Sequence, residues 1–252
     1  MNKTITLAAV PLLIASSLSQ ADTLGFTIGA NVWQQSFSGS VLSSTDTANT
    51  IDLEDDLAYD DENGNNFYIA FEHPIPIIPN IRLAQTEIEV GQATNFNRDI
   101  AFEGVSYSVN EPITSTSDLS HTDATLYYEV LDNWISLDVG LTARIFSEGF
   151  EVTGASSGNS DFDLDETIPM LYAGVKFELP VTGLYVGGHG NFIAFDSNTM
   201  TDITINLGYE TSFGLGVEAG FRSFDIDYEE DSDNEAADIT IDGSYIGLFY
   251  HF

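Results

Sequence analysis

Few side chains of this chain could do acid–base chemistry, and the best-placed pair is His121 and Asp123. Residues two apart on a β-strand point to the same face, so this spacing would put an imidazole beside a carboxylate. Such a pair is the usual arrangement for a general base. His189 stands among glycines in Gly187-Gly-His-Gly190, where a hydrogen-bonded interior residue is the simpler interpretation. The chain contains no cysteine, which excludes disulfides and thiolate catalysis.

Acidic residues dominate the charge: 40 Asp and Glu stand against 6 Lys and Arg, and the formal net charge is −34. This charge excludes nucleic acid as a partner, because its phosphates would be repelled. The acids gather in three stretches, residues 46–62, 161–166 and 229–238.

In the last stretch, Asp231, Asp233 and Glu235 offer carboxylates at alternate positions, as calcium loops do. These are weak metal candidates, since the central glycine and the bidentate glutamate of an EF-hand are missing. We therefore predict no resident metal and no cofactor, and keep divalent cations as partners of the acidic loops.

Alternation of apolar and polar residues predicts β-strands along most of the chain. From Ile135 to Ile145 every second residue is apolar, while Asp138 and Arg144 lie on the opposite face. We count ten strands, at residues 24–37, 66–73, 81–93, 117–130, 134–150, 166–178, 184–195, 201–210, 213–228 and 239–252. Eight or twelve strands are the alternatives, because the second and third are the least regular.

The connections between these strands alternate in length, which predicts an all-β, antiparallel, up-and-down transmembrane barrel. The short ones carry turn residues and lie at 74–80, 132–133, 180–183 and 211–212. The others are mostly long, acidic and rich in Ser, Thr and Asn. Membrane barrels place short turns in the periplasm and longer loops outside. No stretch after residue 21 reaches the ~18 apolar residues of a helical span.

The beginning of the chain has the layout of a secretory signal peptide. A positive start, Met1-Asn-Lys3, precedes an apolar stretch from Ile5 to Leu18 and a small-x-small site, Ser19-Gln20-Ala21. We expect residues 1–21 to be the signal peptide and residues 22–252 to form one barrel domain.

The last strand carries an apolar face that ends on an aromatic residue: Ile246, Leu248, Tyr250 and Phe252. A soluble edge strand rarely ends so, whereas a closing barrel strand needs an apolar face towards lipid. The ending resembles the C-terminal signal of Gram-negative outer-membrane proteins, in which a terminal Phe is read by the assembly machinery. We expect a Gram-negative outer membrane as the location, with its lipid and the barrel assembly machinery as partners.

The inward faces predict a salt-bridged polar network made by Glu129, Asp138, Arg144, Lys176, Glu218 and Arg222. Asp123, Asp202 and Glu210 lie on the same faces. A ten-strand barrel is largely filled by side chains, so we predict a non-enzymatic envelope or surface-interaction protein. A narrow cation-preferring channel or small-solute-binding barrel is the alternative.

Enzymatic alternatives are weaker. His121 and Asp123 resemble the Asp–His pair of ten-stranded outer-membrane proteases, but the order is reversed and the further catalytic acids cannot be placed. The His-Ser-Glu pattern of barrel lipid A deacylases is not matched, since residue 123 is Asp. We therefore predict no enzyme, with a barrel protease or a lipid-modifying enzyme as the least favoured possibilities.

Two further elements are Ile51-Asp-Leu-Glu-Asp-Asp-Leu57 and Phe67-Tyr-Ile-Ala-Phe-Glu-His-Pro-Ile-Pro-Ile-Ile-Pro-Asn-Ile-Arg82. With the signal peptide and the terminal Phe, they resemble a family of small uncharacterised Gram-negative outer-membrane β-barrels. The resemblance implies a fold and a location but no activity. In the first element, Ile51, Leu53 and Leu57 interrupt an acidic run, and we predict that they anchor a plug inside the barrel mouth. Its carboxylates would then meet Lys176 or Arg144.

Overall fold

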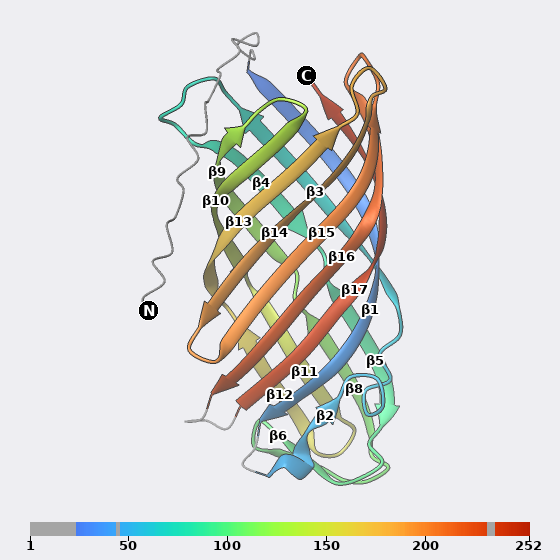
Figure 1. Cartoon of the computed structure of the whole chain (residues 1–252). Coiled ribbons are helices and arrows are strands. Elements are labelled where there is room, and N and C mark those ends of the chain that lie inside the picture. Colours follow the sequence, from blue (N-terminus) through green and yellow to red (C-terminus); the bar gives the residue numbers. More distant parts are fainter. Residues whose placement is uncertain (1–23, 44–45, 231–234) are drawn as a thin grey trace, which may run out of the picture.

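Ten antiparallel strands close into a barrel in the computed structural model, which describes residues 24–43, 46–230 and 235–252 (Figure 1). The barrel strands are β1 Gly25–Ser43, β3 Glu62–Glu72, β4 Asn80–Thr86, β9 His121–Leu131, β10 Ile135–Phe146, β13 Thr167–Glu178, β14 Leu184–Phe195, β15 Asn198–Glu210, β16 Leu215–Glu230 and β17 Glu235–His251. Pairing of β17 with β1 closes the sheet. The prediction of an all-β, ten-strand barrel is confirmed. The predicted signal peptide lies outside the described residues.

Four short connections gather at one end of the barrel, which we call the turn end, together with the last residue of the chain. They join β3 to β4, β9 to β10, β13 to β14 and β15 to β16, where short turns were predicted. No helix in the described part of the chain is long and apolar enough to cross a membrane.

A second sheet continues the barrel wall at the opposite end, and we call this region the head (Figure 1). Its strands are β5 Glu89–Asn95, β8 Pro112–Asp118, β11 Glu148–Gly154 and β12 Gly158–Leu164. The sheet order β12-β11-β8-β5 repeats the order β13-β10-β9-β4 of the barrel strands that adjoin them in sequence. The head sheet is therefore the direct extension of four neighbouring barrel strands.

Short irregular positions separate each barrel strand from its extension. Hydrogen bonds cross these breaks, from Leu119 N to Ile88 O over 2.8 Å and from Phe146 N to Glu166 O over 2.9 Å. Several predicted strands ran straight through a break, and β8 and β12 were mostly taken as loop. Their polar outward faces resemble loop sequence, which is why the prediction missed them. Smaller head elements are η1 Thr47–Asn49, β2 Ile51–Asp52, β6 Ile100–Phe102 and β7 Val105–Tyr107.

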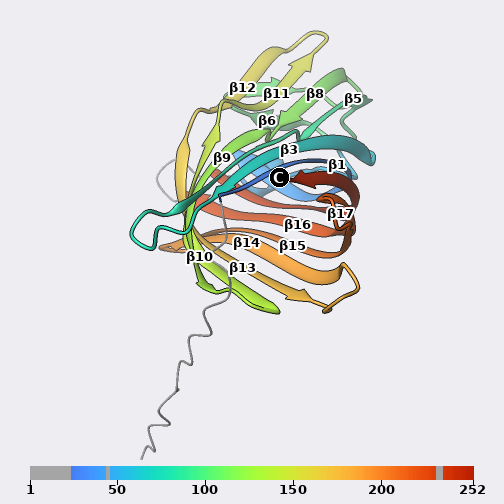
Figure 2. The same ribbon diagram turned by 90° about the horizontal axis from the view of Figure 1, so that it is seen from above.

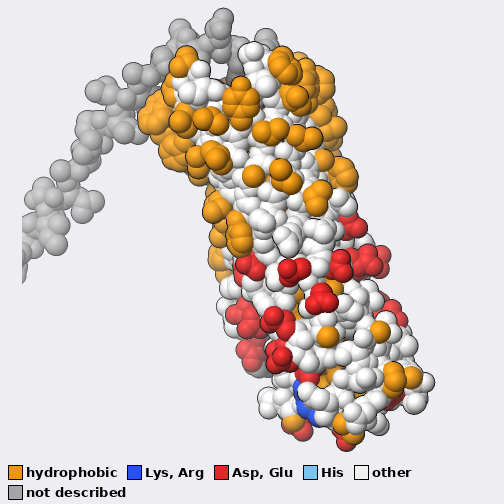
Figure 3. Space-filling model, turned by 90° about the vertical axis from the view of Figure 1, so that its right-hand side faces the viewer, with side chains coloured by type: hydrophobic (Ala, Val, Ile, Leu, Met, Phe, Trp, Pro, Cys, Tyr) orange, Lys and Arg blue, Asp and Glu red, His pale blue; other side chains and the backbone are white. Residues whose placement is uncertain are grey.

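An outward band of apolar side chains surrounds the half of the barrel next to the turn end (Figure 3). On β17, Ile246, Leu248 and Phe252 are 68%, 60% and 68% exposed. Water would not support so much bare apolar surface, whereas the hydrocarbon of a bilayer requires it.

The polarity of both strand faces inverts where the strands leave this band. In the outer half of β17, Ile239 and Ile241 are buried on the inward face, while Asp238 and Asp242 occupy the outward face. On β16, inward Phe224 follows inward Arg222. On the face seen in Figure 3, acidic side chains accordingly gather beyond the apolar band. The inversion marks the level at which the wall passes from lipid to water.

Gly39 permits the close approach of β1 to β17 in this outer half. Its φ is +113°, and a Cβ there would lie 2.0 Å from the carbonyl oxygen of Asp238. Only glycine adopts this backbone conformation freely. Its own carbonyl accepts a 2.9 Å hydrogen bond from the Leu53 amide, which ties the segment after β2 to the barrel.

Candidate functional site

Four charged side chains cross the middle of the barrel, and we call Asp123, Arg144, Asp202 and Arg222 the charge layer. Arg144 Nε and Nη2 donate to Asp123 Oδ1 and Oδ2 over 2.8 and 2.7 Å, and Nη2 also reaches Asp202 Oδ2 at 2.6 Å. Arg222 Nε and Nη2 donate to Asp202 Oδ1 and Oδ2 over 2.8 and 2.6 Å. Every carboxylate oxygen of the layer thus accepts from a guanidinium group, and the formal charges sum to zero.

The barrel register brings these groups together from the inward faces of β9, β10, β15 and β16. Asp123 lies opposite Arg144 on paired strands, but Asp202 reaches the same guanidinium across the lumen. The Arg144 side chain is 0% exposed and that of Asp202 is 4% exposed. A buried ion pair is costly to leave half-made, so this arrangement fixes the register of four strands.

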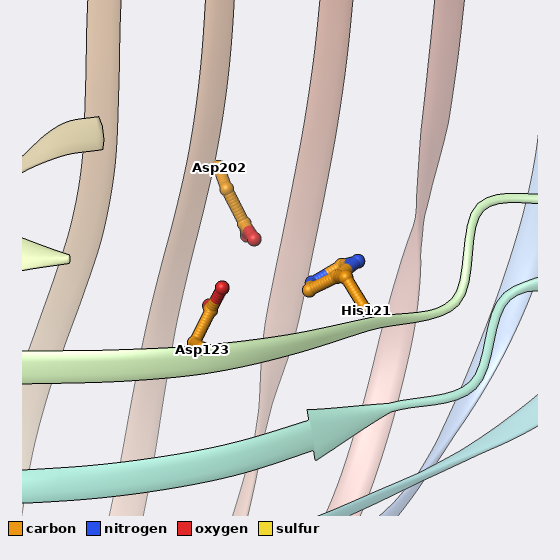
Figure 4. A group of neighbouring side chains, drawn as sticks. All are labelled: His121, Asp123 and Asp202. Atoms are coloured by element: carbon orange, nitrogen blue, oxygen red, sulfur yellow. The ribbon is translucent and has the colours of Figure 1, made fainter. Parts of the chain in front are cut away.

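His121 lies beside the two aspartates (Figure 4). One donor atom from each of His121, Asp123 and Asp202 lies within 4.8 Å of the others, as in a metal-binding group. The carboxylate oxygens are already taken by Arg144 and Arg222, and these two cations oppose a metal ion. His121 Nδ1 donates to the Leu119 carbonyl over 2.9 Å, which leaves Nε2 as an unprotonated, buried acceptor. In this structure the carboxylates of the group bind arginine side chains.

An apolar core closes the barrel on the head side of the charge layer. Phe224 is 0% exposed, and the centre of its ring lies 5.1 Å from Arg144 Cζ and 5.7 Å from the His121 ring. The core continues from the barrel into the head through Trp33, Phe37, Ile88, Phe146, Val152, Met170, Met200, Ile239 and Ile241. The two facing walls of the outer half therefore pack against each other through this core, as in a sandwich.

A small polar cavity lies on the other side of the charge layer, towards the turn end. Its volume is about 50 Å³, enough for a few water molecules. Tyr68, Tyr172 and Tyr245 line it together with Asp123, Asp202 and Arg222. Tyr185 packs with Tyr68 and Phe249 in a second buried cluster. Aromatic side chains thus narrow the lumen on this side too.

The structure gives the other predicted network residues partners outside the charge layer. Lys176 is 37% exposed and pairs with Glu178 at 2.6 Å. Glu218 accepts from the Tyr185 hydroxyl at 3.2 Å and from the Asn206 amide at 2.8 Å. Asp138 is half-buried and Glu129 is exposed near the end of β9. The predicted network is therefore not one continuous set of ion pairs. Glu218 lines the cavity beside the charge layer, whereas Lys176 lies towards the turn end.

The predicted plug residues Ile51, Leu53 and Leu57 are 0%, 3% and 0% exposed in the core shared by barrel and head. The carboxylates of this segment do not meet Lys176 or Arg144, contrary to the prediction. Asp56 instead accepts from Arg98 at 2.5 and 2.9 Å. The cations of the lumen are unsuitable partners, since Arg144 already binds Asp123 and Asp202 in the charge layer and Lys176 lies near the turn end.

Arg98 is the residue that sequence reasoning missed. Besides Asp56 it donates to the Ala48 carbonyl over 3.3 Å and to the Thr50 carbonyl. The hydrogen bond to Asp56 raises the pKa of the guanidinium above its ordinary value. A lone arginine among so many acids was a usable signal, because such a cation is expected to find a carboxylate partner.

Glu111 organises the tip of the head. Its carboxylate accepts from the Ser157 hydroxyl and from the backbone amides of Ser108, Ser156 and Ser157, over 2.5 to 3.2 Å. These hydrogen bonds, that of the Ser157 side chain foremost, lower the pKa of Glu111 to about 2. The turn between β11 and β12 is thereby fastened to the segment before β8.

The weak metal candidates Asp231 and Asp233 lie outside the described residues, and Glu235 begins β17. The predicted assembly signal forms the outward face of β17 and the residue after it. The Phe252 amide donates to the Phe26 carbonyl over 2.9 Å, and the two ring centres are 5.6 Å apart. The last residue thus packs on the first barrel strand.

No protein-family model and no curated protein matches the chain. Among solved structures, it is similar to the translocator domain of the autotransporter NalP from Neisseria meningitidis, with 12% identity and a TM-score of 0.43 over 93% of this chain and 91% of that one. The transport unit of the autotransporter AIDA-I from Escherichia coli gives 10% identity and a TM-score of 0.42, over 96% and 93%. Ail of Yersinia pestis gives 10% identity and a TM-score of 0.33, over 91% of this chain and 99% of that one. The family resemblance drawn from the sequence stays a prediction.

The location follows from the barrel itself. A closed antiparallel barrel leaves no free strand edge for lipid to meet, and its outward band is apolar. At the same level, the inward faces of the strands carry polar side chains that fill the lumen. The chain is therefore an integral β-barrel protein of the Gram-negative outer membrane.

Proposed function

We propose that this barrel holds a folded acidic head at the cell surface for surface interaction or envelope structure, without conducting solutes and without catalysis. The observation that carries the proposal is the continuity of the head with the barrel. Four strands run from the apolar band into the head sheet, and one apolar core serves both. A membrane anchor that rigidly carries an ordered external domain suits a display role.

The interior supports a closed barrel against the channel alternative. The apolar core, the charge layer and the tyrosines succeed one another along the axis from the head to the turn end. Ion passage would require the separation of buried ion pairs and the wetting of an apolar core, both of which are costly.

The environment of His121 supports a non-enzymatic role. Its ring is 2% exposed and packs between Phe146 and Phe224, at centre distances of 5.3 and 5.7 Å. A general base must lie within hydrogen-bond reach of a substrate proton. In the described part of the chain, this imidazole is enclosed by other side chains of the protein.

The acidic exterior supports divalent cations as partners. Two cross-strand pairs of carboxylates stand directly opposite each other in the head sheet, Glu89 with Asp118 and Glu151 with Asp161. Like charges in this position repel, and divalent ions would relieve the repulsion. Recognition of the terminal strand by the assembly machinery belongs to the same proposal.

Two measurements test the display role. Purified protein in planar bilayers should give no steady conductance steps in salt, and steps whose size follows salt concentration would overturn the closed-barrel assignment. Because the chain has no cysteine, Thr114→Cys in the head and Ser212→Cys in a short turn give two matched single-cysteine variants. A membrane-impermeant maleimide should label the first on intact cells and the second only after permeabilisation. The reverse pattern would contradict surface display.

A further inference from the structure

The turn between β3 and β4 differs from the other turns at its end of the barrel. Residues 73–79 read His-Pro-Ile-Pro-Ile-Ile-Pro, and we call them the isoleucine turn. Ile75, Ile77 and Ile78 are 51%, 85% and 50% exposed. In Figure 2 this teal segment stands out sideways beyond the barrel wall. A protruding apolar turn on a periplasmic rim needs an apolar environment.

Contacts on both flanks show which side of the wall the turn occupies. The Tyr128 hydroxyl of β9 donates to the Ile77 carbonyl over 3.0 Å. On the β3 flank, the rings of Phe71 and His73 lie 6.0 Å apart. Tyr128 and Phe71 are 43% and 39% exposed and belong to the outward apolar band. The turn is therefore fastened to the lipid-facing surface rather than to the mouth of the lumen.

The backbone amides of the turn are mostly absent or hydrogen-bonded. Pro74, Pro76 and Pro79 carry no amide hydrogen. Of the remaining amides, that of His73 donates to the Asn80 side chain at 3.1 Å and that of Ile78 to the Ile75 carbonyl at 3.2 Å.

The His73 ring completes this pairing. The Ile75 amide donates to its Nδ1 over 3.2 Å, so Nε2 carries the proton and donates to the Pro79 carbonyl over 3.2 Å. Non-helical backbone at a lipid boundary must satisfy its polar groups internally. For its amides, the isoleucine turn meets most of this demand with three prolines and one imidazole.

We propose that the isoleucine turn is a lateral foot that seats in the periplasmic leaflet, with its three isoleucines among the lipid acyl chains near the headgroup boundary. The occupant of this surface is lipid because both flanking contacts are to lipid-facing aromatics and because the turn continues the apolar band. A foot on one side of the barrel fixes its depth and its tilt, and so the direction in which the head points.

A nitroxide spin label at Ile77→Cys tests the foot in vesicles of phosphatidylethanolamine and phosphatidylglycerol. No native cysteine competes for the label. The ratio of collision rates with oxygen, which partitions into lipid, to those with a water-soluble nickel chelate should be several-fold higher at position 77 than at Ser212→Cys. Equal ratios at the two positions would overturn the proposal. Because these vesicles contain no periplasmic protein, that result would leave the turn free to be a docking surface for such a partner instead of a lipid contact.

A second variant asks whether the isoleucines themselves seat the turn. With Ile75→Ser and Ile78→Ser added, the label at position 77 should move towards the aqueous pattern of position 212, while heat-modifiable migration reports that the barrel is still folded. A label that stays exposed to lipid in this folded variant would show that the isoleucines do not hold the foot, and would also overturn the proposal. Neither result depends on the display role of the head.

Discussion

Arg144 and Asp202 stand on strands that are not neighbours, β10 and β15, yet Nη2 of the arginine lies 2.6 Å from Oδ2 of the aspartate across the lumen. The same carboxylate also holds Arg222 of β16. Parts of the barrel wall that are not adjacent in the sheet are thus joined at one buried point. This cross-lumen contact is where single substitutions should have the largest effect.

Arg144→Ala should lower the free energy of unfolding by about 3–5 kcal/mol, because it leaves two buried carboxylates with too few donors. Urea unfolding in lipid vesicles measures the change. Lys176→Ala is the control, since its ion pair is partly exposed and such pairs contribute about 0–1 kcal/mol. Equal losses in the two variants would contradict the role of the charge layer.

Leu53→Asp should loosen the segment after β2, because it puts a charge into the apolar core that joins barrel and head. Residues 53–57 should then be cut by protease on intact cells, while the barrel keeps its heat-modifiable migration. Val109→Asp is the matched control, as Val109 is 47% exposed in the head. Resistance of the Leu53 variant would argue against a packed plug.

The head tip should lose its order in acid. The lowered pKa of Glu111 means that the folded state favours the ionised carboxylate. Its contribution to stability is therefore complete above the ordinary pKa of 4.5 and is lost as the pH falls towards about 2. Protease cleavage at residues 155–157 should rise across this window. In Glu111→Gln it should be high at every pH, and an unchanged profile in that variant would assign the effect to another group.

Deletion of Phe252 should slow membrane assembly, because it removes the end of the outward apolar face and the contact with Phe26. Fractionation should find protease-sensitive protein in the periplasm. Ser244→Ala, on the outward face of the same strand beyond the apolar band, should assemble normally. Normal assembly of the deletion variant would refute the signal.

The membrane half of the barrel was readable from sequence because lipid imposes one apolar face on each strand. The even-numbered residues of β17 from Ile246 onward show this directly. The outer half was not readable by the same rule, since Ile239 and Ile241 are apolar on the other face. An exchange of the apolar and polar faces within one strand is the sequence signal that would have revealed the head.

The charge layer was predictable only in part. Arg144 and Asp123 are opposite each other on adjacent strands, and the alternation of polar and apolar residues places both on inward faces. Counting residues from the turn between β9 and β10 does not pair them, because the register shifts between Leu137 and Asp138. The contact of Arg144 with Asp202 depends on the stagger of strands around the whole barrel, which no local pattern contains. The contact of Arg98 with Asp56 could not be predicted for a similar reason, because loop residues far apart in the sequence have no fixed register.

The direct passage of four strands from membrane to head, each with only a short irregular break, has a mechanical consequence. Hydrogen bonds of an antiparallel sheet lie across the strands, so a pull along the strand axis loads many of them in shear at once. Tension on the head would pass straight into the barrel wall rather than stretch a linker. A cell tethered through this surface would therefore be held by the collective strength of the sheet.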